Sequence, residues 1–225
     1  DFPGRAFAAM IEGMDHSVGR ILNHLQTLGI AEETIVFFLG DNGSDYSSLP
    51  LRGKKAERYE GGTRVPFIVS WAQPNDSPLQ DRWPISQGVL HNSSFGTILD
   101  LMPTILELTG TQAPKDHTMD GNDLRTDTTG EGAQTFLMHF PHKHRSAYFT
   151  TWHNGDWKLI YQYSAEPRIQ LFNLAQDIEE SNDLAIQHPE LLQEMFNEME
   201  NALNDCQALF PIDPQSKQLL RPYLN

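Results

Sequence analysis

An uninterrupted apolar run at residues 34–39 restricts the fold more than any other feature of the sequence. An apolar, β-branched run that does not alternate is typical of a strand buried on both faces, as in a parallel sheet covered by helices. Before it, residues 7–28 carry apolar side chains at helical spacing, which predicts an amphipathic helix of about seven turns that ends near Gly29. A second buried strand is expected at 66–71 and a helix at about 97–109. Helix, strand, loop, strand and helix in this order indicate an α/β sheet.

The last third of the chain has the pattern of a small antiparallel sheet closed by a helix. The Asn154-Gly155 pair favours a tight hairpin turn. A final helix is expected from about Pro189 to Leu203. The strands of this part are predicted at residues 135–140, 147–152, 157–163 and 168–174. We therefore expect a domain boundary between residues 132 and 133.

Charge and composition exclude several classes of protein. The net charge of -14 disfavours binding to a polyanion, so we expect no nucleic-acid partner. Cys206 is the single cysteine, which rules out an internal disulfide and a cysteine-based zinc site. No apolar stretch approaches the roughly 18 residues of a membrane span. The sequence starts at Asp1 without a signal-peptide pattern, and we expect it to be a piece or a processed form of a longer protein.

Two short polar motifs follow the first predicted strand. Asp41 and Asn42 offer the hard oxygen ligands that Ca²⁺ and Mg²⁺ prefer, although Asp-Asn-Gly is also a common turn. Further along, Lys55 could neutralise a tetrahedral oxyanion near such a cation, or could be a solvated surface charge. Gly61-Gly62 allows backbone conformations that are closed to other residues. Taken one by one, these motifs leave both interpretations open.

Taken together and in order, the motifs resemble the sulfatase family of the alkaline-phosphatase-like superfamily. The resemblance covers almost the whole chain. It rests on the segments Asp-Asn-Gly at 41–43, Leu-Arg-Gly-Lys-Lys at 51–55, Tyr-Glu-Gly-Gly-Thr-Arg-Val-Pro at 59–66, Asp-Leu-Met-Pro-Thr at 100–104, Asp-Gly-Asn-Asp-Leu at 120–124, Trp-Lys-Leu-Ile at 157–160, and Leu-Phe-Asn-Leu at 171–174 with Asn-Asp-Leu-Ala at 182–185.

This resemblance implies a fold and a set of site residues. It implies that residues 1–132 are the C-terminal part of an α/β catalytic domain, built on an alkaline-phosphatase-like mixed sheet between helices. Residues 133–225 would then form a small C-terminal α+β subdomain. Asp41 and Asn42 match metal ligands for Ca²⁺, with Mg²⁺ possible, and Lys55 matches the lysine that contacts the sulfate and the leaving oxygen. Arg64 matches a structural arginine that we expect to pair with Glu60 or a neighbour.

Two parts of the family pattern have no match in these 225 residues. They are the N-terminal sheet with its early metal-binding Asp pair, and the Cys/Ser-x-Pro-x-Arg motif that is converted to the formylglycine nucleophile. Ser48-Leu49-Pro50-Leu51-Arg52 matches the second only superficially, because it follows Asp-Asn-Gly and lacks the helical segment expected after the motif. We therefore expect formylglycine in a missing N-terminal segment of the same protein, and no sulfatase activity from this chain alone.

A histidine cluster adds a third group of candidates. His139, His142 and His144 lie within six residues, among basic neighbours. They could contact a sulfated substrate through imidazole donors, serve the local structure, or form an independent metal site. Related sulfatases have a similar His-x-Pro-His segment, and we assign these histidines to substrate binding.

The function implied by the resemblance is hydrolysis of a sulfuric ester, on a sulfated carbohydrate or an aryl sulfate. A phosphatase or phosphonate hydrolase of the same superfamily is one alternative, and a non-catalytic binding module is another. By analogy with bacterial relatives, a periplasmic or secreted location is expected.

Overall fold

The computed structural model describes residues 2–90, 95–127, 135–143 and 148–224. Its contacts divide the chain into two compact units. The first comprises Asp1–Gly40, Pro66–Asn92 and Thr97–Thr128, and the second comprises Asp41–Val65, Ser93–Gly96 and Thr129–Asn225. The segment Asp41–Val65, which lies between the two predicted strands of the first part of the sequence, thus folds with the second unit.

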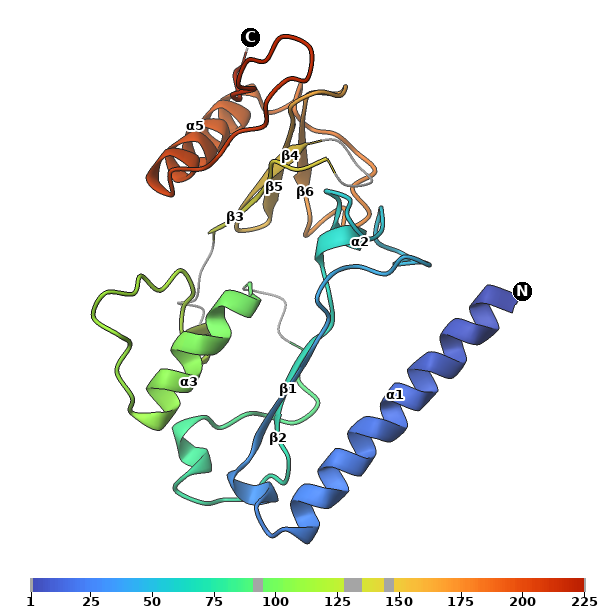
Figure 1. Cartoon of the computed structure of the whole chain (residues 1–225), viewed down its shortest axis with the longest axis vertical. Coiled ribbons are helices and arrows are strands. Elements are labelled where there is room, and N and C mark those ends of the chain that lie inside the picture. Colours follow the sequence, from blue (N-terminus) through green and yellow to red (C-terminus); the bar gives the residue numbers. More distant parts are fainter. Residues whose placement is uncertain (1, 91–94, 128–134, 144–147, 225) are drawn as a thin grey trace. The chain divides into compact units, whose positions relative to one another are not determined.

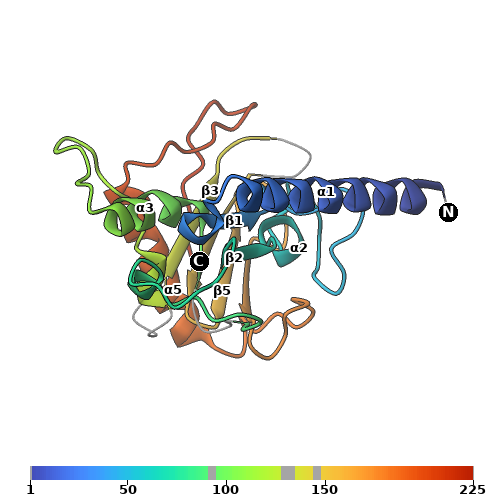
Figure 2. The ribbon, with the colours of Figure 1, turned by 90° about the horizontal axis from the view of Figure 1, so that it is seen from below.

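The first unit begins with a long helix, α1 (Phe2–Thr27), seen end to end in Figure 2. Gly29 follows it with a positive φ of 69°, so the predicted helix and its stop are confirmed. The apolar face of α1 is exposed: Met10 has 72% of its surface accessible and Ile21 has 60%. In globular proteins the apolar face of a helix is normally buried against other elements.

The two strands of the first unit pair with each other. β1 (Ile35–Leu39) and β2 (Phe67–Trp71) run antiparallel, with Ile35 opposite Trp71 and Leu39 opposite Phe67 (Figure 1). Every β1 residue is only partly buried. The sequence predicted a strand buried on both faces in a parallel sheet, and the described strands differ in both respects. A continuous apolar run shows that a strand prefers burial, but it carries no information about the direction of its neighbour.

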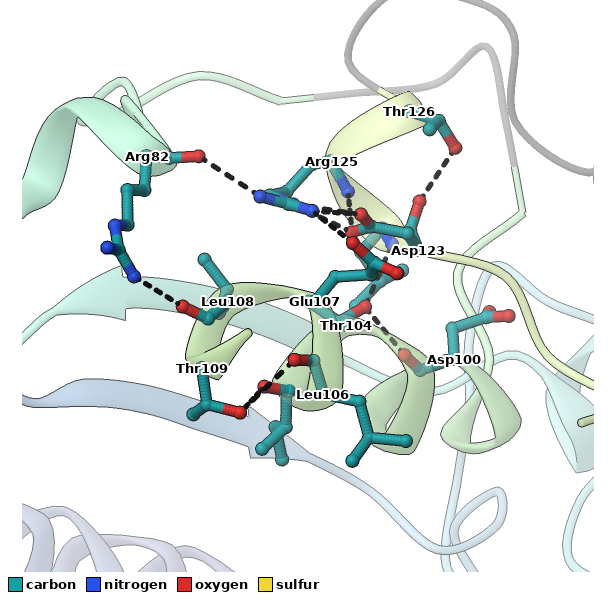
Figure 3. A network of polar contacts seen from close by, with 12 residues as sticks. Arg82, Asp100, Thr104, Leu106, Glu107, Leu108, Thr109, Asp123, Arg125 and Thr126 are labelled. Carbon is teal, nitrogen blue, oxygen red and sulfur yellow. Dashed lines mark hydrogen bonds and ion pairs between the residues drawn. The ribbon is translucent and has the colours of Figure 1, made fainter. Parts of the chain in front are cut away.

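Two of the sequence motifs dock against each other in the first unit. α3 (Leu101–Thr109) starts after Asp100, whose carboxylate accepts hydrogen bonds from the amides of Thr97, at 2.6 Å, and Asn122, at 2.7 Å. The hydroxyl of Thr104, on α3, accepts the amide of Leu124 at 2.9 Å and donates to the carbonyl of Asp100 at 2.6 Å (Figure 3). The segment at 100–104 therefore satisfies backbone amides of the segment at 120–124.

An ion pair strengthens the same junction. The short helix α4 (Leu124–Asp127) carries Arg125, whose guanidinium lies 2.6 Å from Asp123 and 3.7 Å from Glu107 of α3 (Figure 3). Beside it, Arg82 donates to the carbonyl of Leu108 at 3.0 Å. The end of α3 is thus held by side chains from two other segments.

The second unit contains a four-stranded antiparallel sheet. The strands are β3 (Thr135–Phe140), β4 (Phe149–Asn154), β5 (Trp157–Gln162) and β6 (Ile169–Asn173), in that spatial order. This confirms the small antiparallel sheet predicted from the sequence. Asn154 pairs with Trp157, so the hairpin tip is Gly155-Asp156, one residue later than predicted.

The closing helix covers one face of this sheet. α5 (Pro189–Asp205) lies beside the strands of this sheet (Figure 1). It buries Met195, Phe196, Met199 and Leu203 against alternate residues of the strands, including Leu159, Tyr161 and Leu171. This confirms the predicted helix and its inward side chains at 195, 196 and 199, while 191 and 192 are only partly buried.

The opposite face of the sheet is covered by the segment Asp41–Val65. Ile160 and Phe172, which alternate with the residues facing α5, pack with Tyr59 of this segment. Immediately after Tyr59 comes the one-turn helix α2 (Glu60–Thr63). The chain is thus of mixed α/β class with antiparallel sheets and a C-terminal helix. Among the helices that the structure describes, none is both long and apolar enough to cross a bilayer.

Candidate functional site

The segment Asp41–Val65 folds back on itself through backbone hydrogen bonds that meet at Gly61 and Gly62. The amide of Gly43 donates to the carbonyl of Gly62 at 3.0 Å, and the amide of Gly61 donates to the carbonyl of Arg52 at 2.7 Å. The amide of Lys55 donates to the carbonyl of Ser44 at 3.1 Å. The Asp-Asn-Gly turn and the Lys55 turn are therefore parts of one hydrogen-bonded loop.

Glycine is required at this crossing because the backbones approach closely. A Cβ on Gly61 would overlap the carbonyl oxygens of Arg52 and Gly53, and one on Gly62 would overlap that of Glu57. A Cβ on Gly43 would overlap the carbonyl oxygen of Gly61. The sequence suggested that Gly61-Gly62 serves an unusual backbone conformation. That explanation is wrong, since neither residue has a positive φ, and lack of space is the reason instead.

The candidate metal and sulfate ligands lie along this loop. Asp41 is exposed, while Asn42 and Lys55 are half-buried. The backbone bond from Lys55 to Ser44 brings the lysine next to the segment that follows Asn42. Ser48, of the superficial modification motif, donates its hydroxyl to the carbonyl of Gly61 at 2.9 Å and so helps to close the loop. The metal and catalytic roles of Asp41, Asn42 and Lys55 stay predictions.

A buried ionic cluster joins the loop to the four-stranded sheet. The ammonium of Lys158, on β5, is 2.8 Å from Glu60 Oε1 and 2.8 Å from Glu180 Oε1, and all three residues are at most 2% exposed. The other oxygen of Glu180 accepts the amide of Glu60, the first residue of α2, at 2.6 Å. Arg64 closes the cluster on the solvent side, 2.6 Å from Glu60 Oε2. The predicted pairing of Arg64 with Glu60 is confirmed.

The cluster shifts the pKa values of its two carboxyl groups in opposite directions. Burial opposes ionisation of Glu60, but Lys158 and the other nearby cations outweigh it and lower its pKa to about 2. For Glu180, burial outweighs the attraction of Lys158 and raises the pKa. Burial and the charge of Lys158 together lower the pKa of His153 to about 3, so this imidazole is neutral. The carboxylate of Glu60 is therefore the fixed negative centre that Lys158 and Arg64 neutralise.

An aromatic side chain fastens the loop to the sheet beside this cluster. Tyr59 is buried, and its hydroxyl donates to Gln170 Oε1 on β6 at 3.0 Å. The guanidinium carbons of Arg52 and Arg58 lie over its ring at 3.8 and 4.5 Å. Arg52 also donates to the carbonyl of Glu180 at 2.7 Å. Two of the five cationic side chains of the loop thus make cation–π contacts with Tyr59.

The histidine cluster is only partly described. His139 lies on β3, with Nε2 at 2.9 Å from the carbonyl of Leu209 and Nδ1 at 2.8 Å from Thr150 Oγ1. A carbonyl can only accept, so Nε2 carries the proton and Nδ1 accepts from Thr150, whose oxygen in turn accepts from Tyr163. Burial lowers the pKa of His139, in keeping with this neutral form.

The three histidines differ in how available they are to a substrate. His139 would have to give up a hydrogen bond to reach a substrate. His142 is exposed, with its ring edge-on to Phe140 at 5.7 Å. His144 lies outside the described residues. Their assignment to substrate binding stays a prediction.

Sequence reasoning missed the partners of Glu60. Lys158, Glu180 and His153 were quoted only as members of motifs, or not at all. Lys158 is the single charged residue of an otherwise apolar strand segment, Trp-Lys-Leu-Ile at 157–160. A lysine in such a segment indicates a buried partner of opposite charge. Nothing in the sequence, however, indicates which of the 30 acidic residues that partner is.

Comparison with known proteins identifies the family. Residues 5–111 match the family model described as Sulfatase. The chain is 32% identical to mouse steryl-sulfatase over 181 residues, which is 71% of the chain and 27% of the relative.

The chain belongs to the sulfatase family.

Further relatives agree with this. Rat N-acetylgalactosamine-6-sulfatase is 38% identical over 122 residues, covering 51% of the chain and 21% of the relative. The solved structure of Ps i-CgsB in complex with k-i-k-neocarrahexaose superposes with a TM-score of 0.70 at 25% identity, covering 84% of this chain and 40% of that one. The chain thus spans between 21% and 40% of the length of these three proteins.

The donor set of this sulfatase chain fits part of a calcium site. Asp41 and Asn42 offer a carboxylate and an amide oxygen, the ligand chemistry of Ca²⁺ and Mg²⁺. Within the described ranges, no cluster of three or more histidine, cysteine or acidic side chains could hold a metal on its own. Ca²⁺ takes about six to eight oxygens, so these two residues could supply only a share of its ligands.

Proposed function

We propose that the protein carrying this chain hydrolyses sulfate esters, and that the loop Asp41–Val65 supplies part of its active site. The observation that carries the proposal is the folding of this loop. One hydrogen-bonded crossing at Gly61-Gly62 holds the Asp41-Asn42 turn and the Lys55 turn together. The family match of residues 5–111 supports the reaction class.

Each residue has a distinct role in this proposal. Lys55 neutralises negative charge on the sulfate and on the leaving oxygen as the ester bond breaks, a contribution of the kind that fixed charges make in a partly dehydrated site. Asp41 and Asn42 hold an edge of the metal site, where bound Ca²⁺ would polarise the sulfate oxygens. Mg²⁺ would serve the same donors. We place the formylglycine nucleophile outside these 225 residues and assign no nucleophilic role to Ser48.

The names of the relatives support a proposal for the substrate class. A steryl-sulfatase, an N-acetylgalactosamine-6-sulfatase and a protein solved with a neocarrahexaose are all similar to this chain. We therefore propose a sulfated carbohydrate or an aryl sulfate as the substrate, and we also propose a periplasmic or secreted location.

The test is an assay of the protein at its native length, with and without Ca²⁺. Nitrophenyl sulfate and a panel of sulfated monosaccharides are compared with nitrophenyl phosphate. We expect turnover of at least one sulfate ester, loss of turnover after chelation, and clear remaining turnover in a Ser48→Ala variant, which loses a hydrogen bond of the loop but no nucleophile. The 225 residues expressed alone should give no turnover. Preference for the phosphate ester, or activity that Ser48→Ala abolishes, would overturn the proposal.

A further inference from the structure

The loop Asp41–Val65 depends on contacts outside itself. It contains no strand, and its only regular element is the four-residue helix α2. Short segments of this kind are not stable in isolation, so their position must come from tertiary contacts. Among the contacts from the loop to buried polar groups of the sheet and of the turn at residue 180, three are made by Tyr59 and Glu60: Tyr59 to Gln170, Glu60 to Lys158, and the Glu60 amide to Glu180.

These contacts converge on Tyr59 and Glu60, which lie immediately before the glycine crossing. From Glu60 the chain passes into Gly61 and Gly62, whose backbones bond to Arg52 and Gly43. Gly43 directly follows Asp41-Asn42, and Arg52 precedes Lys55 by three residues. A displacement of Glu60 would therefore reach Arg52 through one residue step and one hydrogen bond, and Gly43 through two residue steps and one hydrogen bond, so both halves of the candidate site would move.

The buried charges of the cluster compensate one another. Lys158 is fully buried between two buried carboxylates, and each carboxylate has its second oxygen occupied, by Arg64 in Glu60 and by the Glu60 amide in Glu180. Separating any member leaves an uncompensated charge away from water, which is strongly unfavourable. A buried group of charges that compensate one another in this way resists displacement of any one member.

We propose that Lys158 and Glu180 are positioning residues of the sulfatase site: acting through Glu60, they hold the Asp41–Val65 loop in the arrangement that places Lys55 and the Asp41-Asn42 turn for catalysis. This rests on the proposed function for its catalytic consequence, but its structural half stands without it. Neither residue is assigned a contact with substrate or metal.

Glu180→Gln is the variant that tests this most directly. One oxygen of Glu180 accepts from the Glu60 amide while the other faces the Lys158 ammonium. A glutamine has a single oxygen, so its NH₂ group must face a donor at one of these two places. The substitution keeps size and shape and removes one contact of the network. Glu179→Gln is the matched control, because Glu179 is the neighbouring residue of the same type and is exposed.

The first readout is amide hydrogen exchange in the protein at its native length, which needs no activity. In Glu180→Gln the amides of Gly43, Gly61 and Arg64 should exchange at least about tenfold faster, while amides of β4 and β5 change by less than about threefold. Glu179→Gln should change neither set. Equal acceleration in the loop and in the sheet would show general destabilisation and would overturn the proposal, as would no acceleration in the loop.

The second readout is sulfate ester hydrolysis per folded enzyme. We expect kcat to fall at least about tenfold in Glu180→Gln with KM within about threefold, because a misplaced charged group loses transition-state stabilisation. An unchanged kcat beside a loosened loop would refute the catalytic half. A native protein that hydrolyses no sulfate ester would refute the proposed function alone, since the exchange result is independent of it.

A milder variant covers the case in which Glu180→Gln does not fold. Tyr59→Phe removes the hydroxyl that donates to Gln170 and accepts from Arg58, and it leaves every charge of the cluster in place. The same loop amides should exchange about threefold faster, again without a change in β4 and β5. Absence of that selective effect would contradict the proposal.

Discussion

Replacement of Lys158 by methionine tests the energetic account of the buried cluster. The side chains are similar in length, so the main change is loss of the charge between Glu60 and Glu180. Removing one partner of a buried ion pair costs about 3–5 kcal/mol. Here two carboxylates lose the same partner, so we expect a loss near the upper end of that range, about 5 kcal/mol. A domain is stable by only about 5–15 kcal/mol, so the variant should be close to unfolding.

The assay is urea unfolding of the protein at its native length at pH 7, followed by circular dichroism. Lys143→Met is the control, because Lys143 is exposed, and it should change the free energy of unfolding by less than about 0.5 kcal/mol. Adding Glu180→Gln to Lys158→Met should recover about 2 kcal/mol, since one unpaired charge is then gone.

The pH dependence gives an independent check on the same substitution. Without Lys158 the two carboxylates bind protons more readily, so the stability deficit of the variant should shrink as the pH is lowered from 7 toward 4.5. A deficit below about 1 kcal/mol at pH 7, or one that grows on acidification, would refute the reasoning.

Two further predictions concern His153 and the first unit. His153 has a pKa near 3 when folded and about 6.5 when unfolded, so its contribution to stability is complete above pH 6.5 and is lost as the pH falls. The wild type should therefore lose about 2 kcal/mol between pH 7 and 5, and His153→Phe should lose much less; parallel curves would contradict this. Thr104→Val, which leaves the buried Leu124 amide without its acceptor, should cost about 2 kcal/mol in thermal or urea unfolding, against less than about 0.5 kcal/mol for the exposed Thr109→Val. Equal effects of the two threonine substitutions would show that the docking of the two motifs contributes nothing.

Periodicity in the sequence predicted most of the regular elements. In β5, every second residue packs toward α5, as Leu159 and Tyr161 do. In α5, Met195, Phe196 and Met199 recur at helical spacing and pack toward the sheet. These elements could be predicted because each buries one face, and the apolar residues of that face recur at the spacing of a helix or a strand. The direction of β1 relative to its neighbour could not, because an apolar run is the same for either direction.

The candidate site was predictable only in part. The motifs between residues 41 and 66 indicated where the candidate site lies, and they suggested Glu60 or a neighbour as the partner of Arg64. The second face of β5 carries Lys158 and Ile160, and no pattern in the sequence shows what covers it. The answer is a loop about 100 residues earlier in the chain, held by Glu60 and Tyr59. Contacts at that separation come from tertiary packing, which local pattern does not encode.

The central claim is that Lys55 acts on the sulfate ester, and the adjacent lysine provides a direct test. Lys54 is exposed whereas Lys55 is half-buried and bonded through its backbone to Ser44. The measurement is kcat/KM for a sulfate ester in Lys55→Ala and Lys54→Ala variants of the protein at its native length. Loss of one preorganised charge at the reacting group typically costs 10²–10³-fold, so Lys55→Ala should lose at least about a hundredfold and Lys54→Ala less than about threefold. Retention of activity in Lys55→Ala, or equal losses in both variants, would contradict the account.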